Sequence, residues 1–307
     1  MARRTPSELN LLLAIDKPVG CTSHDIVGRV RRAVGERRVG HAGTLDPLAS
    51  GIMIVGIGQA TRLLGMITLD RKQYVARIMF GSETTTDDAE GEVTRAAKPV
   101  ADLYDPGCAR SALSRFIGVQ EQVPPAYSAI SINGVRSYKL ARSGEEVELP
   151  ARSIEVYGAD LIAIDTLDGV PVWTVAFDVS KGTYIRSLAR DLGRSVGGAA
   201  HLCDLRRTAS GCVNASMCLT AEDLTCEVAR ARCLDPVQVL GLSALEIADD
   251  QLADVLCGKL LCMDFPDHIE RFALLNRGEL RAIAVPQEGR LRMTDVFPQG
   301  IEGAHLH

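Results

Sequence analysis

Apolar and polar positions along the first 210 residues switch between the period of a strand and the period of a helix. In residues 72–81 every second position is apolar, which predicts a strand with one buried face. Residues 23–34 repeat isoleucine and valine on one helical face after Thr22 or Ser23, which predicts a capped helix. Residues 35–47 are rich in glycine and charge and are predicted as a loop. The same reasoning predicts strands at 9–16, 51–58, 154–161 and 170–180, and helices at 59–66, 105–117 and 187–196.

Short apolar runs near the C-terminal end predict a small β-rich domain. These runs are residues 272–275, 280–285 and 291–296, separated by Asn-Arg-Gly and Glu-Gly turns. Before them the pattern predicts helices at 221–234 and 252–261, with a linker at 236–248. A length of 307 residues suggests two domains. We therefore expect one domain of residues 1–240 and a second of residues 241–307.

Residues 122–150 differ from the segments around them. They begin with a Pro124-Pro125 pair, contain an Asn133-Gly134 turn signal and carry several basic residues. This composition predicts an inserted arm outside the core.

The net charge of −5 conceals an uneven distribution. Residues 219–307 hold 15 acidic and 8 basic side chains, whereas residues 1–218 hold 24 acidic and 26 basic ones. Two stretches of the first part, residues 29–38 and 181–210, are basic. Basic clusters can neutralise phosphates, so the overall acidity does not exclude a nucleic-acid partner. Two solvated helix faces remain the alternative.

The nine cysteines include no C-x-x-C pair, which disfavours zinc ribbons and zinc fingers. Their odd number and the lack of an export signal predict reduced thiols in a cytoplasmic protein. The longest apolar stretches are far shorter than the roughly 20 residues of a membrane helix, so we expect no membrane association. His24 and His41 have no Cys or Glu partner at ligand spacing, so no metal site is predicted.

The densest candidate chemistry lies in residues 40–51, GHAGTLDPLASG. Pro47 favours an extended conformation at Asp46, so that its carboxylate can project from a loop. The glycine spacing does not fit a phosphate-binding loop. An Asp-Pro pair is by itself most often a simple turn, and that reading stays open.

Two further stretches carry candidate side chains. If the strand at 170–180 extends through Arg186, then Tyr184 and Arg186 share one face. A tyrosine can stack on a base, and an arginine can pair with a carboxylate and lower its pKa. Tyr74 lies on the predicted strand 72–81. Simple packing or strand decoration remains the alternative for all three.

These residues resemble the tRNA pseudouridine synthase B family, the bacterial tRNA pseudouridine-55 synthases. Residues 40–51 are similar to the signature of the family, and several other blocks match in family order. They are KPVGCTSH (17–24), KQY (72–74), PPAYSA (124–129), GTYIR (182–186), GAAHL (198–202) and LRRT (205–208). Residues 245–307 resemble a small RNA-binding domain of the PUA type more loosely.

The resemblance implies a fold and a reaction. The fold is α+β, the pseudouridine synthase fold, with a mixed, mainly antiparallel central sheet, flanking helices, the inserted arm and a PUA-like C-terminal domain. The reaction isomerises uridine 55 in the T-arm of tRNA: the C1′–N1 bond breaks, and the uracil turns and rejoins through C5. It uses base flipping and needs no cofactor and no metal.

The resemblance also implies roles for residues. Asp46 would act at the ribose, either as a nucleophile or as a base at C2′, and Arg186 would keep it ionised. Tyr74 would stack on the uracil and could take part in proton transfer. Tyr184 and Leu205 would line the pocket, with His41 beside the flipped nucleotide. Weaker contacts to the RNA backbone are expected from Lys17, Arg37, Arg38, Lys181, Arg206 and Arg207.

The partner implied is the T-arm stem-loop of tRNA, over which the arm 122–150 would close. We expect a monomer that needs no protein partner. Two alternatives remain: a non-catalytic RNA-binding protein on the same scaffold, and a glycosidase. A glycosidase would need a second carboxylate, for which Asp70, Asp87 and Asp88 are candidates.

Overall fold

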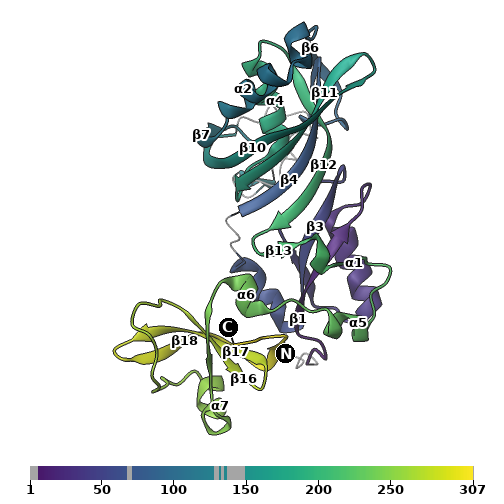
Figure 1. Ribbon diagram of the computed structural model, residues 1–307. Coiled ribbons are helices and arrows are strands. Elements are labelled where there is room, and N and C mark those ends of the chain that lie inside the picture. Colours follow the sequence, from purple (N-terminus) through teal and green to yellow (C-terminus); the bar gives the residue numbers. More distant parts are fainter. Residues whose placement is uncertain (1–5, 68–70, 128–130, 133–134, 137–148, 307) are drawn as a thin grey trace. The chain divides into compact units, whose positions relative to one another are not determined.

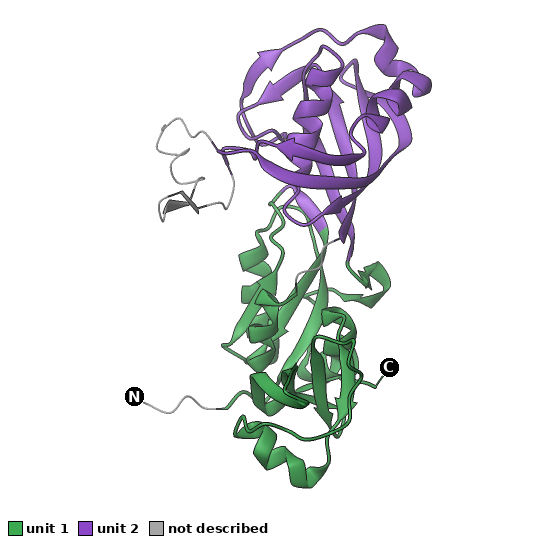
Figure 2. Cartoon of the chain, turned by 90° about the vertical axis from the view of Figure 1, so that its left-hand side faces the viewer, with its two compact units in different colours: residues 1–47, 51–69, 211–307 green, residues 48–50, 70–210 purple. Residues whose placement is uncertain are grey.

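The computed structural model describes residues 6–67, 71–127, 131–132, 135–136 and 149–306. The chain forms two compact units (Figure 2). Unit 1 contains residues 1–47, 51–69 and 211–307, and unit 2 contains residues 48–50 and 70–210. This division differs from the two domains expected from the sequence, whose boundary near residue 240 stays a prediction. Most of the predicted arm lies outside the described residues.

Unit 2 is built on an antiparallel sheet in the order β12-β4-β11-β10-β7. The strands are β4 (Arg71–Phe80), β7 (Gly118–Gln122), β10 (Arg152–Leu167), β11 (Val170–Ser180) and β12 (Ala200–Ser210). The alternation seen in the sequence buries Tyr74, Ala76, Ile78 and Phe80 of β4 on one face. The strands predicted around residues 72–81, 154–161 and 170–180 are therefore confirmed.

Two helices and several short elements complete unit 2. Helix α2 (Pro106–Ser114) is capped by the carboxylate of Asp105, which accepts from the amides of Gly107 and Cys108 at 3.2 and 2.9 Å. Helix α4 (Ile185–Ser195) packs on β12 and β4. The short elements are β5 (Ser82–Thr84), β6 (Val93–Ala96), η2 (Ala101–Tyr104), β8 (Ser131–Ile132) and β9 (Val135–Arg136).

The prediction that Tyr184 and Arg186 share a strand face is wrong. Strand β11 ends at Ser180, and Gly182 has a φ of 81°, a left-handed value that breaks the extended run. Tyr184 is the N-cap residue of α4, and Arg186 lies in its first turn. The apolar residues after Ile185 recur at helical spacing, which favours a helix over a longer strand.

The N-terminal part of unit 1 is a mixed sheet with helices on it (Figure 1). Strand β1 (Leu11–Lys17) pairs antiparallel with β3 (Ala49–Ile57) and parallel with β14 (Cys218–Leu219), and β2 (Val39–Ala42) pairs with β3. The prediction of a loop at 35–47 missed β2. This strand is short and contains a glycine, so it shows no alternation of apolar and polar residues. The other elements are α1 (Ser23–Val34), η1 (Gly58–Gly65), β13 (Val213–Asn214), η3 (Ala215–Met217) and α5 (Cys226–Ala231).

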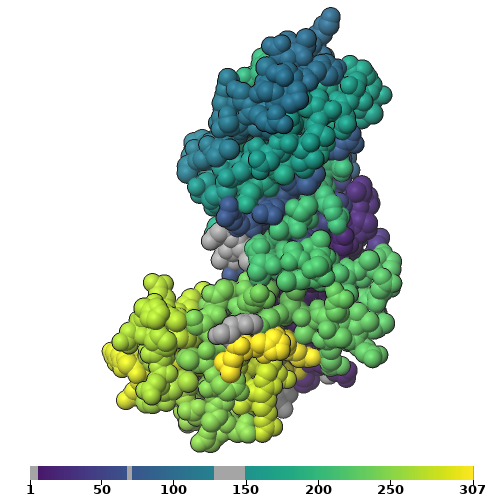
Figure 3. Space-filling view, in the orientation of Figure 1, coloured from purple at the N-terminus to yellow at the C-terminus, as the bar shows by residue number. Residues whose placement is uncertain are grey.

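The predicted C-terminal β-rich part is confirmed as a separate four-stranded sheet in the order β15-β16-β17-β18. In Figure 3 the residues of this C-terminal part, coloured yellow-green to yellow, adjoin one another. The elements are α6 (Pro236–Leu240), β15 (Ser243–Glu246), α7 (Asp249–Leu256), β16 (Phe272–Asn276), β17 (Glu279–Gln287) and β18 (Arg290–Glu302). The predicted linker 236–248 is wrong, because Asp235 caps α6 and β15 pairs with β16. None of the described helices is long and apolar enough to cross a membrane.

The C-terminal sheet shares a core with the start of the chain. Leu12 of β1 and Ile54 of β3 belong to the same buried cluster as Ile283, Phe297 and Ile301. A second buried cluster, which includes Phe272 and Leu291, is formed by the C-terminal sheet, α7 and the segments that flank this helix. Unit 1 is therefore stabilised by contacts between residues far apart in sequence.

Trp173 of β11 connects the short helix η2 to the sheet of unit 2. Its substitution tests how much this contact contributes to the core. The side chain is fully buried, its ring centroid lies 4.5 Å from that of Phe80, and its Nε1–H donates to the Leu103 carbonyl at 2.7 Å. We expect Trp173→Phe to lower the free energy of unfolding by about 2–4 kcal/mol, because it loses packing and leaves a buried carbonyl unpaired. Urea unfolding followed by circular dichroism measures this.

Tyr104→Phe is the matched control. It removes a hydrogen bond to the Gly169 carbonyl, but at a residue that is 44% exposed. Its effect on the free energy of unfolding should stay within about 0.5 kcal/mol. Equal losses in the two variants would contradict the assignment of Trp173 as a core anchor.

Candidate functional site

The loop that carries Asp46 connects β2 to β3 and is held on both sides of this residue. On one side Leu45 is buried, its N–H donates to Ser23 Oγ at 2.9 Å, and Ser23 Oγ donates to the Leu45 carbonyl at 3.0 Å. On the other side the Gly20 N–H donates to the Pro47 carbonyl at 2.9 Å. Asp46 itself remains half-buried. The backbone on either side is thus fixed without burial of the residue between.

The partners of this loop come from the segment before α1. Thr22 caps the helix, and its side chain exchanges hydrogen bonds with Asp25 in a capping box. The neighbouring Ser23 uses its hydroxyl on the Asp46 loop instead. Lys17 is fully buried, and its Nζ donates to the carbonyls of Pro18 and Cys21 at 2.9 and 2.7 Å. Its burial gives no support to the predicted contact with an RNA phosphate.

The other predicted residues of unit 1 lie near this loop in sequence. His41 lies on β2 opposite Val55 of β3 and is half-buried. Arg37 and Arg38 are exposed, and Arg38 Nε donates to Thr61 Oγ1 at 2.9 Å.

In unit 2 the strand register puts several predicted residues on one face of the sheet. Tyr74 of β4 is directly opposite Arg207 of β12, and Ala76 is opposite Leu205. Tyr74 and Leu205 are buried, and Arg207 is only 1% exposed. Arg207 is therefore part of this buried face, and its burial gives no support to the predicted phosphate contact. Burial, together with the charge of Arg207, lowers the pKa of Lys72 on the same face to about 8.

Helix α4 carries three arginines at spacings of four residues, each facing a carboxylate. Arg186 Nη1 lies 3.5 Å from Asp88 Oδ2, and Arg190 Nη1 lies 2.8 Å from Asp87 Oδ2. Farther along the helix, Arg194 Nη2 lies 2.7 Å from Glu83 Oε2. Asp88, Asp87 and Glu83 are all buried.

Arg186 is held by backbone as well as by charge. Its Nη1 donates to the Thr86 carbonyl at 2.9 Å and its Nη2 to the Tyr127 carbonyl at 3.0 Å. The side chain is 6% exposed, so its orientation is fixed by these contacts. A fixed guanidinium is suited to pairing with an anion in a bidentate manner.

The sequence did not reveal the arginine–carboxylate contacts. From the sequence alone, Asp87 and Asp88 are candidates only as acids of a glycosidase, but both are buried and ion-paired with arginines. Asp70, the third such candidate, lies outside the described residues. The repeat of arginine at three positions of one helix face was the signal that could have found them.

Tyr184 is half-buried at the start of α4, with the Arg152 guanidinium 5.3 Å from its ring centroid. Lys181, just before it, is exposed. Arg206 is half-buried, and its Nη1 lies 3.4 Å from the hydroxyl of Ser50.

The candidate residues are thus divided between the two units. Asp46 and His41 belong to unit 1, whereas Tyr74, Arg186 and Leu205 belong to unit 2. The expected ion pair between Asp46 and Arg186 joins residues of different units and stays a prediction. Among the described residues, no group of three or more His, Cys, Asp or Glu side chains could hold a metal ion.

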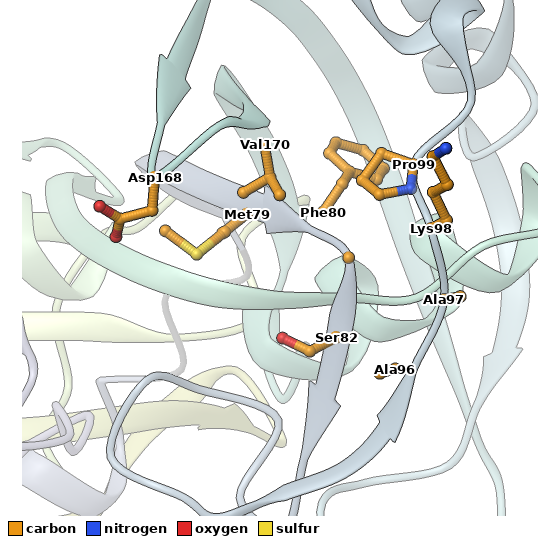
Figure 4. A pocket seen from close by; sticks show the side chains of 10 residues that line it. Met79, Phe80, Ser82, Ala96, Ala97, Lys98, Pro99, Asp168 and Val170 are labelled. Carbon is orange, nitrogen blue, oxygen red and sulfur yellow. The ribbon is translucent and has the colours of Figure 1, made fainter.

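A shallow cavity of about 390 Å³ lies elsewhere in unit 2 (Figure 4). It is lined by β4, β6 and the turn before β11, with Phe80, Pro99 and Val170 among its walls. None of the predicted site residues lines it, and it has no cluster of convergent polar groups.

Comparison with protein families matches residues 31–185 to the TruB family pseudouridylate synthase N-terminal domain. The chain belongs to this family. Residues 186–240 match the tRNA pseudouridylate synthase B C-terminal domain. The members of the TruB family are isomerases, so the chain is classed with enzymes that form pseudouridine.

Relatives of the TruB family support the assignment over most of the chain. The chain is 47% identical over 220 residues to tRNA pseudouridine synthase B of Thermobifida fusca (strain YX), covering 70% of this chain and 74% of that protein. It is 40% identical over 286 residues to tRNA pseudouridine synthase B of Cutibacterium acnes, covering 90% and 93%.

Solved structures agree with the fold expected for the TruB family. An H/ACA RNP bound to a substrate RNA containing 2′-deoxyuridine matches with a TM-score of 0.66 and 21% identity, covering 94% of this chain and 84% of that one. The archaeal box H/ACA sRNP Nop10-Cbf5 complex matches with a TM-score of 0.65 and 23% identity, covering 94% and 85%. These similarities confirm the predicted pseudouridine synthase fold.

The two hydroxyls at the start of α1 allow a test of how the Asp46 loop is held. We expect Ser23→Ala to lower the free energy of opening at residues 44–48 by about 1–3 kcal/mol, because the buried N–H and C=O of Leu45 lose their partner. Amide hydrogen exchange read by mass spectrometry measures this. Thr22→Ala is the control, since it removes the helix cap and should speed exchange only at the start of α1. Unchanged exchange at residues 44–48 in Ser23→Ala would argue against the hydroxyl contact.

The buried Asp87 makes stability depend on pH. Burial raises the pKa of Asp87 from its ordinary value of 3.8 to about 6, although Arg190 and Arg186 act to lower it. Between these values the folded state holds a proton that the unfolded state has released, so the free energy of unfolding falls as pH rises through this window. Urea unfolding of the native protein and of Asp87→Asn from about pH 4 to about pH 7 measures the difference. We expect a flatter pH dependence in the variant; parallel curves would exclude Asp87 as the source.

Proposed function

We propose that this chain isomerises uridine 55 in the T-arm of tRNA to pseudouridine, with Asp46 as the essential carboxylate. The observation that carries the proposal is that hydrogen bonds hold the backbone at Leu45 and Pro47, while Asp46 between them is only half-buried. A carboxylate on a fixed backbone, with no place in a packed core, is suited to act on a bound substrate. The relatives named tRNA pseudouridine synthase B support tRNA as the substrate.

The reaction asks for a carboxylate at the ribose and a place for the detached base. The C1′–N1 bond breaks, the uracil turns and C5 bonds to C1′. C5 then loses a proton and N1, released from the ribose, gains one, so the atoms balance without a further reactant. Asp46 acts either as a nucleophile or as a base at C2′. An ionised form serves both roles, and Arg186 would favour it through an ion pair.

The face of β4 and β12 supports a pocket for the base. Tyr74 and Leu205 are buried on one side of the sheet, where an aromatic ring and an aliphatic side chain can hold a flat uracil. Tyr184 at the start of α4 is half-buried and offers a second aromatic ring. In the proposed complex the target base leaves the folded loop, and contacts in this pocket offset the loss of stacking, about a few kcal/mol. His41 fills the space beside the flipped nucleotide.

Exposed cations support binding of the RNA backbone. Arg37, Arg38 and Lys181 are exposed, and Arg206 is half-buried. These four remain as proposed phosphate contacts, whereas the burial of Lys17 and Arg207 favours structural roles for those two.

A substitution of Asp46 tests the proposal directly. We expect Asp46→Asn to reduce pseudouridine formation by about a thousandfold or more, because the amide can neither attack nor accept a proton, while tRNA affinity changes little. Chemical labelling of pseudouridine in a tRNA transcript gives the product at position 55, and filter binding gives the affinity. Asp204→Asn, at an exposed carboxylate of β12, is the control and should remain active.

Two results would overturn the proposal. Activity of Asp46→Asn near that of the native protein would remove Asp46 from the mechanism. Labelled product in a transcript with cytidine at position 55 would move the target uridine elsewhere in the tRNA.

A further inference from the structure

Gln122, the last residue of β7, is only 1% exposed, and its side-chain amide is bonded to the backbone of Tyr184 at both ends. Gln122 Nε2 donates to the Tyr184 carbonyl at 3.1 Å, and the Tyr184 N–H donates to Gln122 Oε1 at 2.9 Å. The amide thus pairs with this peptide backbone as one strand pairs with another. A two-point contact of this kind fixes orientation as well as distance.

The residue held in this way is the start of α4. Tyr184 is the N-cap of the helix, but its own side chain makes no capping hydrogen bond. Its carbonyl also accepts from the Leu188 N–H at 3.1 Å, which closes the first helical turn. Arg186 lies in this first turn. The amide of Gln122 therefore fixes the backbone from which the side chains of both Tyr184 and Arg186 extend.

The chain that follows Gln122 makes further contacts with the same helix. The Val123 carbonyl accepts from Ser187 Oγ and from Arg190 Nη2, each at 3.0 Å. The Tyr127 carbonyl accepts from Arg186 Nη2 at 3.0 Å. Residues 122–127 are therefore bonded to the first two turns of α4, and we call this segment the latch. Gln122 is the residue of the latch whose side chain bonds to the backbone at the start of the helix.

We propose that Gln122 is a positioning residue for pseudouridine formation, which sets the place of Tyr184 and Arg186 through the first turn of α4. This inference rests on the proposed function, in which Tyr184 lines the base pocket and Arg186 pairs with Asp46. Gln122 acts only through these two residues. Its loss therefore affects the rate of turnover more than the affinity for tRNA, since a small misplacement of reacting groups is costly to the rate.

Gln122→Met tests the proposal, because methionine has nearly the same volume but neither a donor nor an acceptor of comparable strength. We expect kcat to fall by about tenfold or more while the Kd for tRNA stays within about twofold. Hydrogen exchange in the free protein should speed up at residues 184–188, where the backbone has lost its partner.

Gln120→Met is the matched control from the same strand. Gln120 Nε2 donates to the Phe116 carbonyl at 2.6 Å, so this variant also removes a glutamine–backbone hydrogen bond, but none to α4. Its kcat and its exchange at residues 184–188 should match those of the native protein. Equal behaviour of the two variants in turnover and in exchange would overturn the proposal.

The conservative variant Gln122→Glu separates positioning from folding. It keeps the oxygen that accepts from the Tyr184 N–H, but in place of the donor it puts a second carboxylate oxygen opposite the Tyr184 carbonyl, so kcat should fall at least as far as in Gln122→Met. If Gln122→Met does not fold, Gln122→Glu carries the test, and native turnover in it would overturn the proposal. Absence of product with the native protein would refute the proposed function instead, while the exchange at residues 184–188 would still report on the latch.

Discussion

The burial of two guanidinium groups on one face of α4 is the constraint on which the rest of unit 2 depends. The side chains of Arg186 and Arg190 are 6% and 11% exposed, and a cation removed from water requires carboxylate or carbonyl partners. Asp87 and Asp88 supply the charge, and the carbonyls at Thr86, Val123 and Tyr127 supply further acceptors. The turn after β5 and the chain after β7 are therefore both held by one helix.

In unit 1, too, buried polar groups hold a candidate segment in place, but there the groups are neutral. A single hydroxyl, that of Ser23, satisfies both the N–H and the C=O of Leu45, and the Gly20 N–H satisfies Pro47. The loop thereby keeps a defined shape without a place in the core for Asp46. In both units the residues expected to touch substrate are few, and buried neighbours with no expected contact to it hold them in position.

Regular periodicity made much of the fold predictable, and local exceptions account for what was missed. Strands β4 and β11 and helix α1 follow from alternation and from a capping box, which are local properties. Helix α6 has local signals, with Asp235 as its cap, Pro236 at its start and Gly241 at its end, but its five residues are too few to show a period. Strand β2 is short and depends on its pairing with β3. At the site, the motifs indicated Asp46, Tyr74 and Arg186. The repeat of arginine on one face of α4 indicates that carboxylates pair with this helix, but the partners of Arg186 come from distant segments, which the repeat does not identify.

The core that joins β1 and β3 to the C-terminal sheet has a consequence for how the chain matures during synthesis. Nearly all of unit 2 is one continuous stretch, residues 70–210, which can fold as soon as it has left the ribosome. Leu12 and Ile54 are made before this stretch, but they share their buried cluster with Phe297 and Ile301, which are made after it. The apolar surface of β1 and β3 therefore stays without these partners until the C-terminal sheet has been translated.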